Sequence, residues 1–289
     1  MPDPRHPDPH HRLLALAGLV PDSWLVIARE ALADRDHGQL ERLFGALADV
    51  GRDRVAHRFE PPATPSAHDR AVVQAVASHQ AAACWRAMRA GTDPVYLVQA
   101  RPGVDLAAIT GAVQRVLTAR GERSPRVEVF GPTTALLRYH EDALLAATLL
   151  WSAEPAEPVR VARAFDGASA TDGPWFNPVR ELVVAADERQ RLLDFLAGGE
   201  VVLPVPDTLD DVLSRSPRPV PVDLRSDGRW VWSEASRYYL ERYMLSPDPE
   251  FADHAASHAP RTALTHLERY RVRAALTPAG EEGPLWRAG

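Results

Sequence analysis

The stretch SDGRWVWSEASRYYLERY, residues 226–243, carries the strongest local signal in this chain. Its last fourteen residues hold two tryptophans and three tyrosines, whereas the whole chain of 289 residues has 7 Trp and 6 Tyr. Asp227-Gly228 is the two-residue signal of a type I′ β-hairpin. We expect a helix over 233–245 to follow at once, because Ser233 is a good N-cap. The stretch therefore predicts a hairpin joined directly to a helix.

The pairing that follows from this turn gives the hairpin two largely apolar faces. It sets Arg225 opposite Trp230 and Leu224 opposite Val231, and side chains at paired positions share a face. One face then carries Leu224 and Val231, and the other carries Trp230 and Trp232. Either the following helix folds back and covers the indoles as core, or the aromatic face binds a partner, since Trp, Tyr and Arg dominate interface hot spots. A third option is an aromatic cleft for a small molecule.

The binding interpretation also includes a long loop at 165–178, which holds two acidic residues, two glycines and a Trp-Phe pair. Loops of this length are often functional. The residues that we expect to contact a partner come from this loop, the hairpin and the helix after it: Trp230, Trp232, Tyr239, Tyr243, Arg225, Trp175 and Phe176.

Outward from the hairpin, the pattern of elements predicts an α+β fold. Residues 1–11 are rich in Pro and His and are expected to be a disordered tail, and residues 12–59 form a helical module. After a Pro-rich linker at 60–66, residues 67–151 form an α+β domain that starts with a long helix over 67–91. Residues 159–289 form a second α+β domain with the Trp hairpin and C-terminal helices. The order of elements favours mixed or antiparallel sheets with helices packed on one face.

Composition and charge narrow the classes of partner. The net charge is −6, and all 33 basic residues are arginines that alternate with acidic residues instead of forming a basic face, so a nucleic-acid partner is disfavoured. No apolar run approaches the ~18 residues of a membrane span, and the start lacks the pattern of a secretory signal. A single cysteine, Cys84, excludes an internal disulfide and fits a reducing cytoplasm. We expect it to lie in the core.

Histidines near the C-terminus are the candidate metal ligands. His254 and His258 are four residues apart on an expected helix, a spacing that can present two imidazoles to one ion. A third ligand would be Asp253 or His266. The glutamate of the HExxH motif is absent, and exposed helical histidines are common. We therefore expect no metal and no cofactor.

Two other places could carry chemistry. His140, Glu141 and Asp142 stand where an expected strand meets a helix and could form an acid/base cluster, although acidic residues in a first helical turn are expected from the helix dipole alone. The sequence QARPGVDL could hold an anion at a helix N-terminus, but it lacks the glycine pattern of a phosphate-binding loop. No catalytic motif stands out.

The segments GPWFNPVRELVV and DGRWVWSEASRYYLERYMLSPDPEFADHA resemble the C-terminal part of uncharacterised proteins from GC-rich actinobacteria. The resemblance covers about a third of the chain and implies a bacterial, cytoplasmic protein. It implies no activity.

Together these observations predict a soluble cytoplasmic factor that binds another protein without catalysis, of the immunity or accessory type. The alternative is a hydrolase or transferase with a site built from scattered residues around the 165–178 loop, with His140 or the C-terminal histidines. We expect a protein partner and neither a membrane nor nucleic acid.

Overall fold

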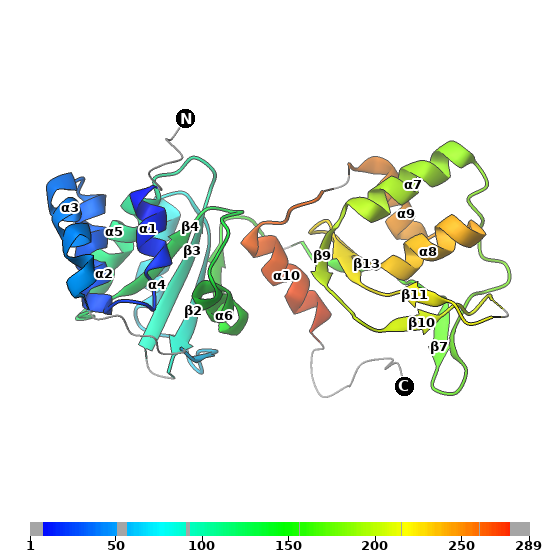
Figure 1. Cartoon of the computed structure of the whole chain (residues 1–289), viewed down its shortest axis with the longest axis horizontal. Helices are drawn as coiled ribbons and strands as arrows, with labels where there is room; N and C mark the ends of the chain where they lie inside the picture. The colour runs from blue at the N-terminus through cyan, green and yellow to red at the C-terminus, as the bar shows by residue number, and fades with distance from the viewer. Residues whose placement is uncertain are drawn as a thin grey trace. The chain divides into compact units, whose positions relative to one another are not determined.

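A computed structural model shows two compact units, residues 1–155 and 156–289 (Figure 1). The structure describes residues 8–50, 57–90, 93–155, 157–214, 216–259 and 261–277. Each unit packs helices on a mixed sheet, so the predicted α+β class is confirmed. Within the described ranges, no helix is long and apolar enough to cross a membrane.

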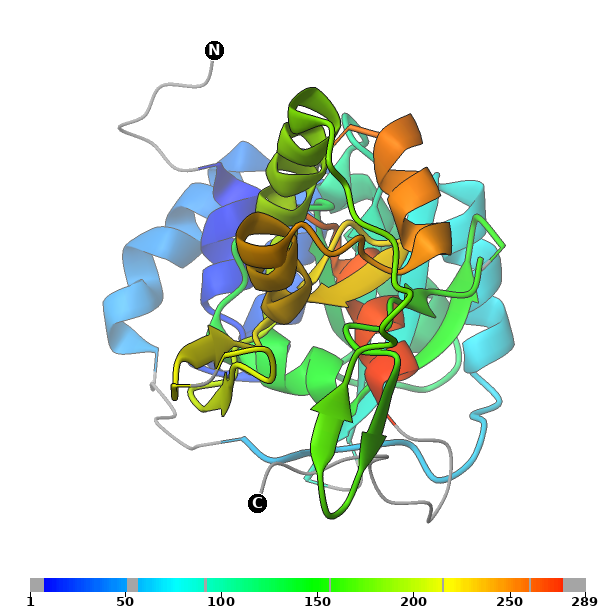
Figure 2. The same cartoon turned by 90° about the vertical axis from the view of Figure 1, so that its right-hand side faces the viewer.

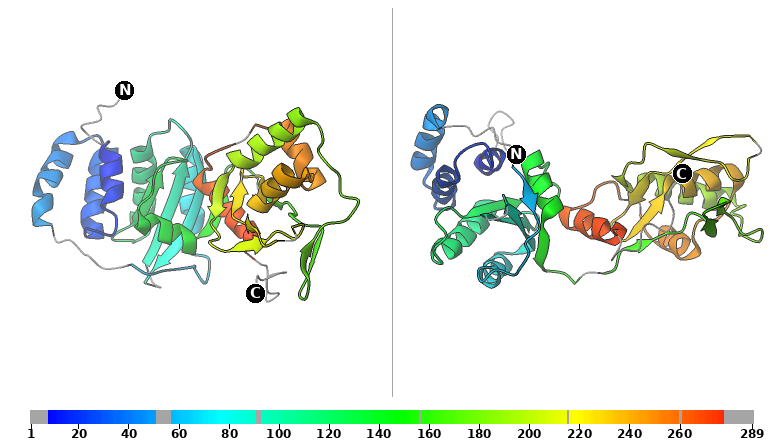
Figure 3. Two further views of the ribbon diagram at one scale, coloured as in Figure 1. Left: turned by 45° about the vertical axis from the view of Figure 1, so that its right-hand side comes forward. Right: turned by 90° about the horizontal axis from the view of Figure 1, so that it is seen from below.

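The first unit is a sheet with helices on both faces. Its strands run in the order β1-β2-β3-β4, and β5 also pairs with β2. β3 and β4 are parallel and are joined through α5, while the other pairs are antiparallel. α4 and α5 cover one face and α6 the other (Figure 3). The elements are α1 (Pro9–Ala15), α2 (Asp22–Ala33), α3 (His37–Gly45), a 3₁₀ turn (Ala46–Asp49), β1 (Phe59–Glu60), α4 (Asp69–Ser78), β2 (Ala81–Arg89), β3 (Asp93–Ala100), α5 (Leu106–Thr118), β4 (Arg126–Phe130), α6 (Arg138–Ala146) and β5 (Thr148–Ser152).

The predicted long helix over 67–91 is wrong in its second half. α4 ends at Ser78, the chain turns at Gln80, whose φ is 58°, and β2 begins at Ala81. Residues 81–87 include four alanines, and alanine is the best helix former. Pairing with β3 along almost the whole strand outweighs that local preference. Cys84 lies on β2 and is buried, as expected.

Polar contacts join the N-terminal helices α1 and α2 to the sheet. Arg29 of α2 forms a buried ion pair with Glu128 of β4, with 2.7 Å between Nη2 and Oε2. The His10 ring bonds the carbonyl oxygen of Val129 at 2.8 Å. α1 begins at Pro9, inside the range predicted to be a tail, whereas residues 1–7 lie outside the described residues. Separability of the helical module stays a prediction.

The second unit is built on a sheet in the order β6-β13-β12-β9. β6 and β13 are parallel, the other pairs are antiparallel, and β7–β8 and β10–β11 form two further hairpins. The elements are β6 (Arg160–Val161), β7 (Gly167–Ser169), β8 (Gly173–Trp175), α7 (Ala186–Gly198), β9 (Glu200–Leu203), β10 (Thr208–Asp210), β11 (Pro219–Pro221), β12 (Leu224–Ser226), β13 (Trp230–Ser233), α8 (Glu234–Tyr243), α9 (Pro249–Ser257) and α10 (His266–Leu276).

Helices cover both faces of this second sheet, which explains why both faces of the hairpin are apolar. Trp230 and Trp232 face α7, α8 and α9, where they join one core cluster. Val231 faces α10 and packs with Val272 and other residues of a second cluster. Figure 1 shows α10 on one side of the strands and α7 to α9 on the other. In both units, helices therefore lie on both faces of the sheet.

The hairpin register differs from the prediction by a shift of the turn. The structure pairs Arg225 with Trp232 instead of Trp230, and the loop consists of Gly228 and Arg229, closed by a bond from the Asp227 N–H to the Trp230 oxygen. The cause is the Asp227 side chain, whose Oδ1 accepts the N–H groups of Arg229 and Trp230 at 2.9 and 2.8 Å. Gly228 then takes a positive φ of 94°, which glycine tolerates. Partners move by two positions, so the side chains keep their predicted faces.

Candidate functional site

The two hairpin tryptophans are buried in the core of the second unit. The Trp232 ring lies 5.6 Å from that of Phe195 on α7 and 5.1 Å from that of Phe251 on α9. Its Nε1 donates to the carbonyl oxygen of Leu196 at 3.0 Å. This is the arrangement of the core interpretation, except that α7 and α9 contribute more of the cover than α8. A partner reaches Trp230 and Trp232 only if these helices move, and their binding role stays a prediction.

The predicted tyrosines belong to a neighbouring cluster. Tyr239 is buried between Phe165 and Phe176, with ring centroids 5.7 and 4.7 Å away. Tyr243 is half-buried, and its hydroxyl donates to the carboxylate of Asp211. The cluster holds the 165–178 loop against α8. These contacts account for the tyrosines by packing and hydrogen bonding.

Arg225 and Trp175 occupy different environments. Arg225 donates from Nη1 to the carbonyl oxygen of Gly199 at 2.6 Å and from Nε to Glu234, so it binds the end of α7. Trp175 on β8 is 49% exposed and lies against the backbone of Gly167. Among the seven predicted binding residues, Trp175 therefore presents the most accessible ring.

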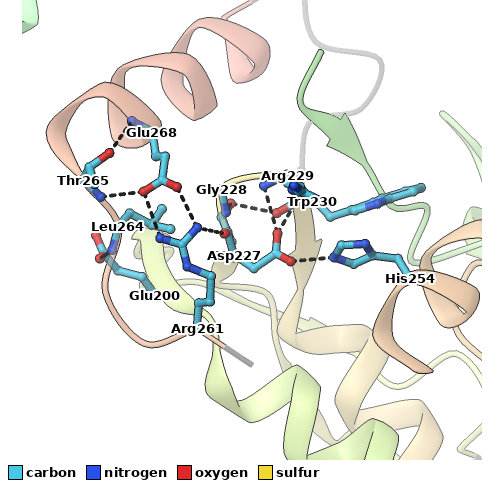
Figure 4. Close-up of polar contacts among 11 residues, drawn as sticks. Glu200, Asp227, Gly228, Arg229, Trp230, His254, Arg261, Leu264, Thr265 and Glu268 are labelled. Carbon is cyan, nitrogen blue, oxygen red and sulfur yellow. Dashed lines mark hydrogen bonds and ion pairs between the residues drawn. The ribbon is translucent and has the colours of Figure 1, made fainter. Parts of the chain in front are cut away.

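A cluster of polar contacts lies at the hairpin turn of the second unit (Figure 4). Asp227 is buried, and its Oδ2 lies 2.6 Å from Nε2 of His254 on α9. Burial raises the pKa of Asp227, yet the hydrogen bonds from His254 and from the N–H groups of Trp230 and Arg229 outweigh it, so the pKa lies below its ordinary value. One carboxylate oxygen of Asp227 therefore stabilises the turn, and the other binds His254 of α9.

An imidazole oriented by a buried carboxylate is the arrangement of a general base. A nucleophilic mechanism also requires a hydroxyl or thiol beside the ring. Among the described residues none bonds the His254 ring, and the Ser257 hydroxyl donates to the backbone oxygen of Asp253. The geometry therefore explains the pair as a link between hairpin and helix.

The 165–178 loop folds into the β7–β8 hairpin. Asp166 pairs with Arg180 at 3.1 Å, and Asp172 accepts hydrogen bonds within its own turn. His140, the other residue of the predicted enzyme site, belongs to the first unit. An enzyme site around the loop stays a prediction without a contact that favours it.

The three C-terminal histidines do not converge. His258 stacks on His254 with 4.1 Å between the ring centroids, and its Nδ1 bonds the backbone oxygen of His254. His266 begins α10 on the other side of the sheet, where it is buried. Across the described ranges, no group of three His, Cys, Asp or Glu side chains is placed to hold a metal ion.

His140, which the sequence analysis considered for acid/base chemistry, lies in the core of the first unit. Its Nε2 is 3.1 Å from Oε2 of Glu128, which also accepts two hydrogen bonds from Arg29. Burial raises the pKa of Glu128, but Arg29 and His140 together lower it to about 2. Glu141 and Asp142 point elsewhere, since Asp142 pairs with Arg138. His140 thus belongs to a buried Arg29–Glu128–His140 triad, where the sequence had left open an acid/base cluster with Glu141 and Asp142.

A concave surface between α7 and α9 of the second unit is open to a ligand. Figure 2 shows the two helices side by side. The groove between them has a volume of about 470 Å³. Buried Leu192 and Phe195 form part of its floor, and Leu182, which is 48% exposed, lines it as well. We call this surface the α7–α9 groove.

Carboxylates outnumber cations around the α7–α9 groove. Glu181, Glu188, Asp194 and Asp253 line it, against one arginine, Arg191. All of these side chains are exposed. No ion pair between a groove carboxylate and Arg191 is present among the described residues. The groove therefore combines an apolar floor with a negative rim.

No local sequence pattern indicated this groove directly. Residues 199–248 separate α7 from α9, and the contact between these helices depends on the hairpin that both of them cover. One signal was present in the sequence, since α7 carries three acidic residues, Asp187, Glu188 and Asp194. The pairing with α9 could not be inferred from it.

Comparisons with family models, with curated proteins and with solved structures found no match to this chain.

Proposed function

We propose that this protein is a binding factor, of the accessory or immunity type, whose second unit takes a basic amphipathic helix of a partner protein in the α7–α9 groove. The observation that supports the proposal is the combination of an apolar floor with four carboxylates around it. Helix-in-groove recognition requires such a floor for the apolar stripe of the ligand. The excess of carboxylates selects lysine or arginine on the flanks of that stripe.

The shape of the groove favours a helix as occupant. Two helices that lie side by side leave a channel between them, and a third helix fills such a channel with the side chains of one stripe. Leu182 lines the groove and is exposed, and Val184, two residues further along the chain, is exposed as well. Exposed apolar side chains gathered beside a concave surface are typical of an interaction site.

The test uses labelled amphipathic peptides about four turns long, one made of leucine and lysine and one of leucine and glutamate. Fluorescence polarisation with the full chain should show micromolar binding of the lysine peptide, weaker at high salt, and no binding of the glutamate peptide. Equal binding of both peptides, or of neither, would overturn the proposal.

Two neighbouring residues of α7 provide a matched pair of variants. Glu188 lines the groove, whereas Asp187 is equally exposed and does not. Both lie in the first turn of α7, so each loses the same interaction with the helix dipole on replacement. Glu188→Lys should weaken binding of the lysine peptide about tenfold, and Asp187→Lys should change it little. Equal effects of the two changes would place the peptide elsewhere.

A further inference from the structure

The sheet of the second unit ends at β9 in an edge that no described strand covers. β9 pairs with β12 on one side. Val201 and Leu203 on this strand are 40% and 46% exposed. Native edge strands commonly carry charged side chains that prevent further pairing, but the charge of Glu200 is held in an ion pair with Arg269. Pro204 follows the strand and keeps it short. The edge is open to one further short strand.

A groove runs beside this edge, between β9 and α10. Its volume is about 440 Å³. Val202 and Leu203 line it from the strand, and Val272 and Leu276 line it from the helix. Figure 1 shows α10 next to β9, on the side of the sheet opposite to α7 and α9. We call this surface the β9–α10 groove. It is separate from the α7–α9 groove.

Arg273 is the polar group of the β9–α10 groove for which the described residues supply no counter-ion. One turn earlier on α10, Arg269 forms two hydrogen bonds with Glu200. Arg273 lines the groove, and no carboxylate of the described residues pairs with it. Partial desolvation lowers its pKa, and only Tyr270 acts in the opposite direction. A guanidinium in this position is suited to bind a carboxylate.

We propose that the β9–α10 groove binds an extended segment of a partner protein that adds as a strand to β9 and places a carboxylate on Arg273. The main chain of the segment bonds the open edge, and alternate apolar side chains contact Val202, Val272 and Leu276. The carboxylate is either the end of the partner chain or an acidic side chain near it. The segment is thus extended, apolar at alternate positions and acidic at one place.

A second copy of this chain fits the groove less well than a foreign segment. Pairing of β9 with β9 in a two-fold dimer would bring the same surface of both copies together. Arg273 of one copy would then approach Arg273 of the other, and like charges across an interface oppose association. The carboxylate of an acidic segment is instead attracted to Arg273.

The test uses labelled peptides of alternating valine and threonine, about eight residues long. One ends in a free carboxylate, one is amidated, and one is amidated with an aspartate as its last residue. Fluorescence polarisation with the full chain should show at least about tenfold tighter binding of a carboxylate peptide than of the plain amidated peptide. The first and third peptides distinguish a chain end from an acidic side chain. Equal binding of all three, or binding of none, would overturn the proposal.

Arg273→Gln should abolish the advantage of the carboxylate, whereas Arg273→Lys should keep part of it. Arg242→Gln is the matched control, because Arg242 also lies in the last turn of its helix but far from the groove. Leu203→Glu should weaken all three peptides. Circular dichroism confirms that each variant folds.

The oligomeric state tests the other possible occupant. A concentration-dependent dimer that Leu203→Glu abolishes would mean that a second copy occupies the groove, and it would overturn the assignment of a foreign segment. Variants of the α7–α9 groove should leave these results unchanged.

Discussion

Replacement of Arg29 by methionine should destabilise the first unit by more than any surface change. Arg29 and Glu128 are 4% and 2% exposed, and two hydrogen bonds of 3.1 and 2.7 Å join them. Arg29→Met leaves a buried carboxylate with His140 as its remaining partner, and breaking a buried ion pair in this way costs about 3–5 kcal/mol. The pKa of Glu128 agrees in direction, because burial raises it and Arg29 is the largest of the interactions that nevertheless lower it from 4.5 to about 2.

The assay is urea unfolding of the full chain, combined with hydrogen exchange of peptides from α2 and β4. The exchange data distinguish the first unit from the second. Arg115→Met is the control, because Arg115 and Asp34 form an ion pair in which both side chains are exposed, at 56% and 67%. Its loss should cost less than about 1 kcal/mol.

A double variant separates the ion pair from packing. Arg29→Met with Glu128→Gln removes both charges while the amide can still accept a hydrogen bond from His140. This variant should recover most of the stability lost in the single variant, since replacing both charges of a buried pair is often neutral. A single variant that loses less than about 1 kcal/mol, or a double variant as unstable as the single one, would refute the reasoning.

Four further predictions use other parts of the chain. Trp232→Ala should lower the free energy of unfolding by about 3–5 kcal/mol, while the exposed Trp175→Ala should change it little, and equal losses in urea unfolding would contradict the core position of Trp232. Because the folded pKa of Glu128 is about 2 and its ordinary value is 4.5, its contribution to stability is fully present above pH 4.5 and is lost as the pH falls towards 2. Melting temperatures over this acid range should therefore fall more steeply in the original protein than in Glu128→Gln, and parallel curves would count against it. The thiol of Cys84, whose pKa is raised by burial, should react with a disulfide reagent only in denaturant, and rapid labelling of the folded protein would be the contrary result. Untagged protein should purify without stoichiometric zinc, and a chelator should leave its melting temperature unchanged. One zinc per chain by elemental analysis would restore the metal hypothesis for His254, His258 and His266.

Elements with a clear hydrophobic period were predictable from the sequence. α5 and α7 carry apolar stripes at helical spacing, and the predicted helix at 233–245 corresponds to α8 with Ser233 as its N-cap. β2 was not predictable in this way. Its alanines and arginines favour a helix locally, and the strand forms because β3 and β5 pair with it on both sides. That choice depends on residues far away in the sequence.

The candidate sites also depend on contacts between residues that are far apart in the sequence. The hairpin was visible in Asp227-Gly228, but the turn shifted by one residue because the Asp227 carboxylate binds two backbone N–H groups. The partner of that carboxylate, His254, was noted only as a metal ligand. Both grooves form where helices and strands distant in the sequence meet, so no local pattern reveals them. The residues that line a groove come together only when the whole unit has folded.

The contacts of Asp227 also bear on how this protein ages chemically. An Asp-Gly bond is prone to isomerise when the glycine nitrogen attacks the aspartate side-chain carbon, expels water and closes a succinimide ring. In the folded chain the Gly228 N–H donates to the Ser226 hydroxyl at 2.9 Å, while both carboxylate oxygens of Asp227 are held by Arg229, Trp230 and His254. The attack geometry is thereby blocked. Isoaspartate at position 227 would accumulate only in molecules whose hairpin has opened, and its amount records how often that opening occurs.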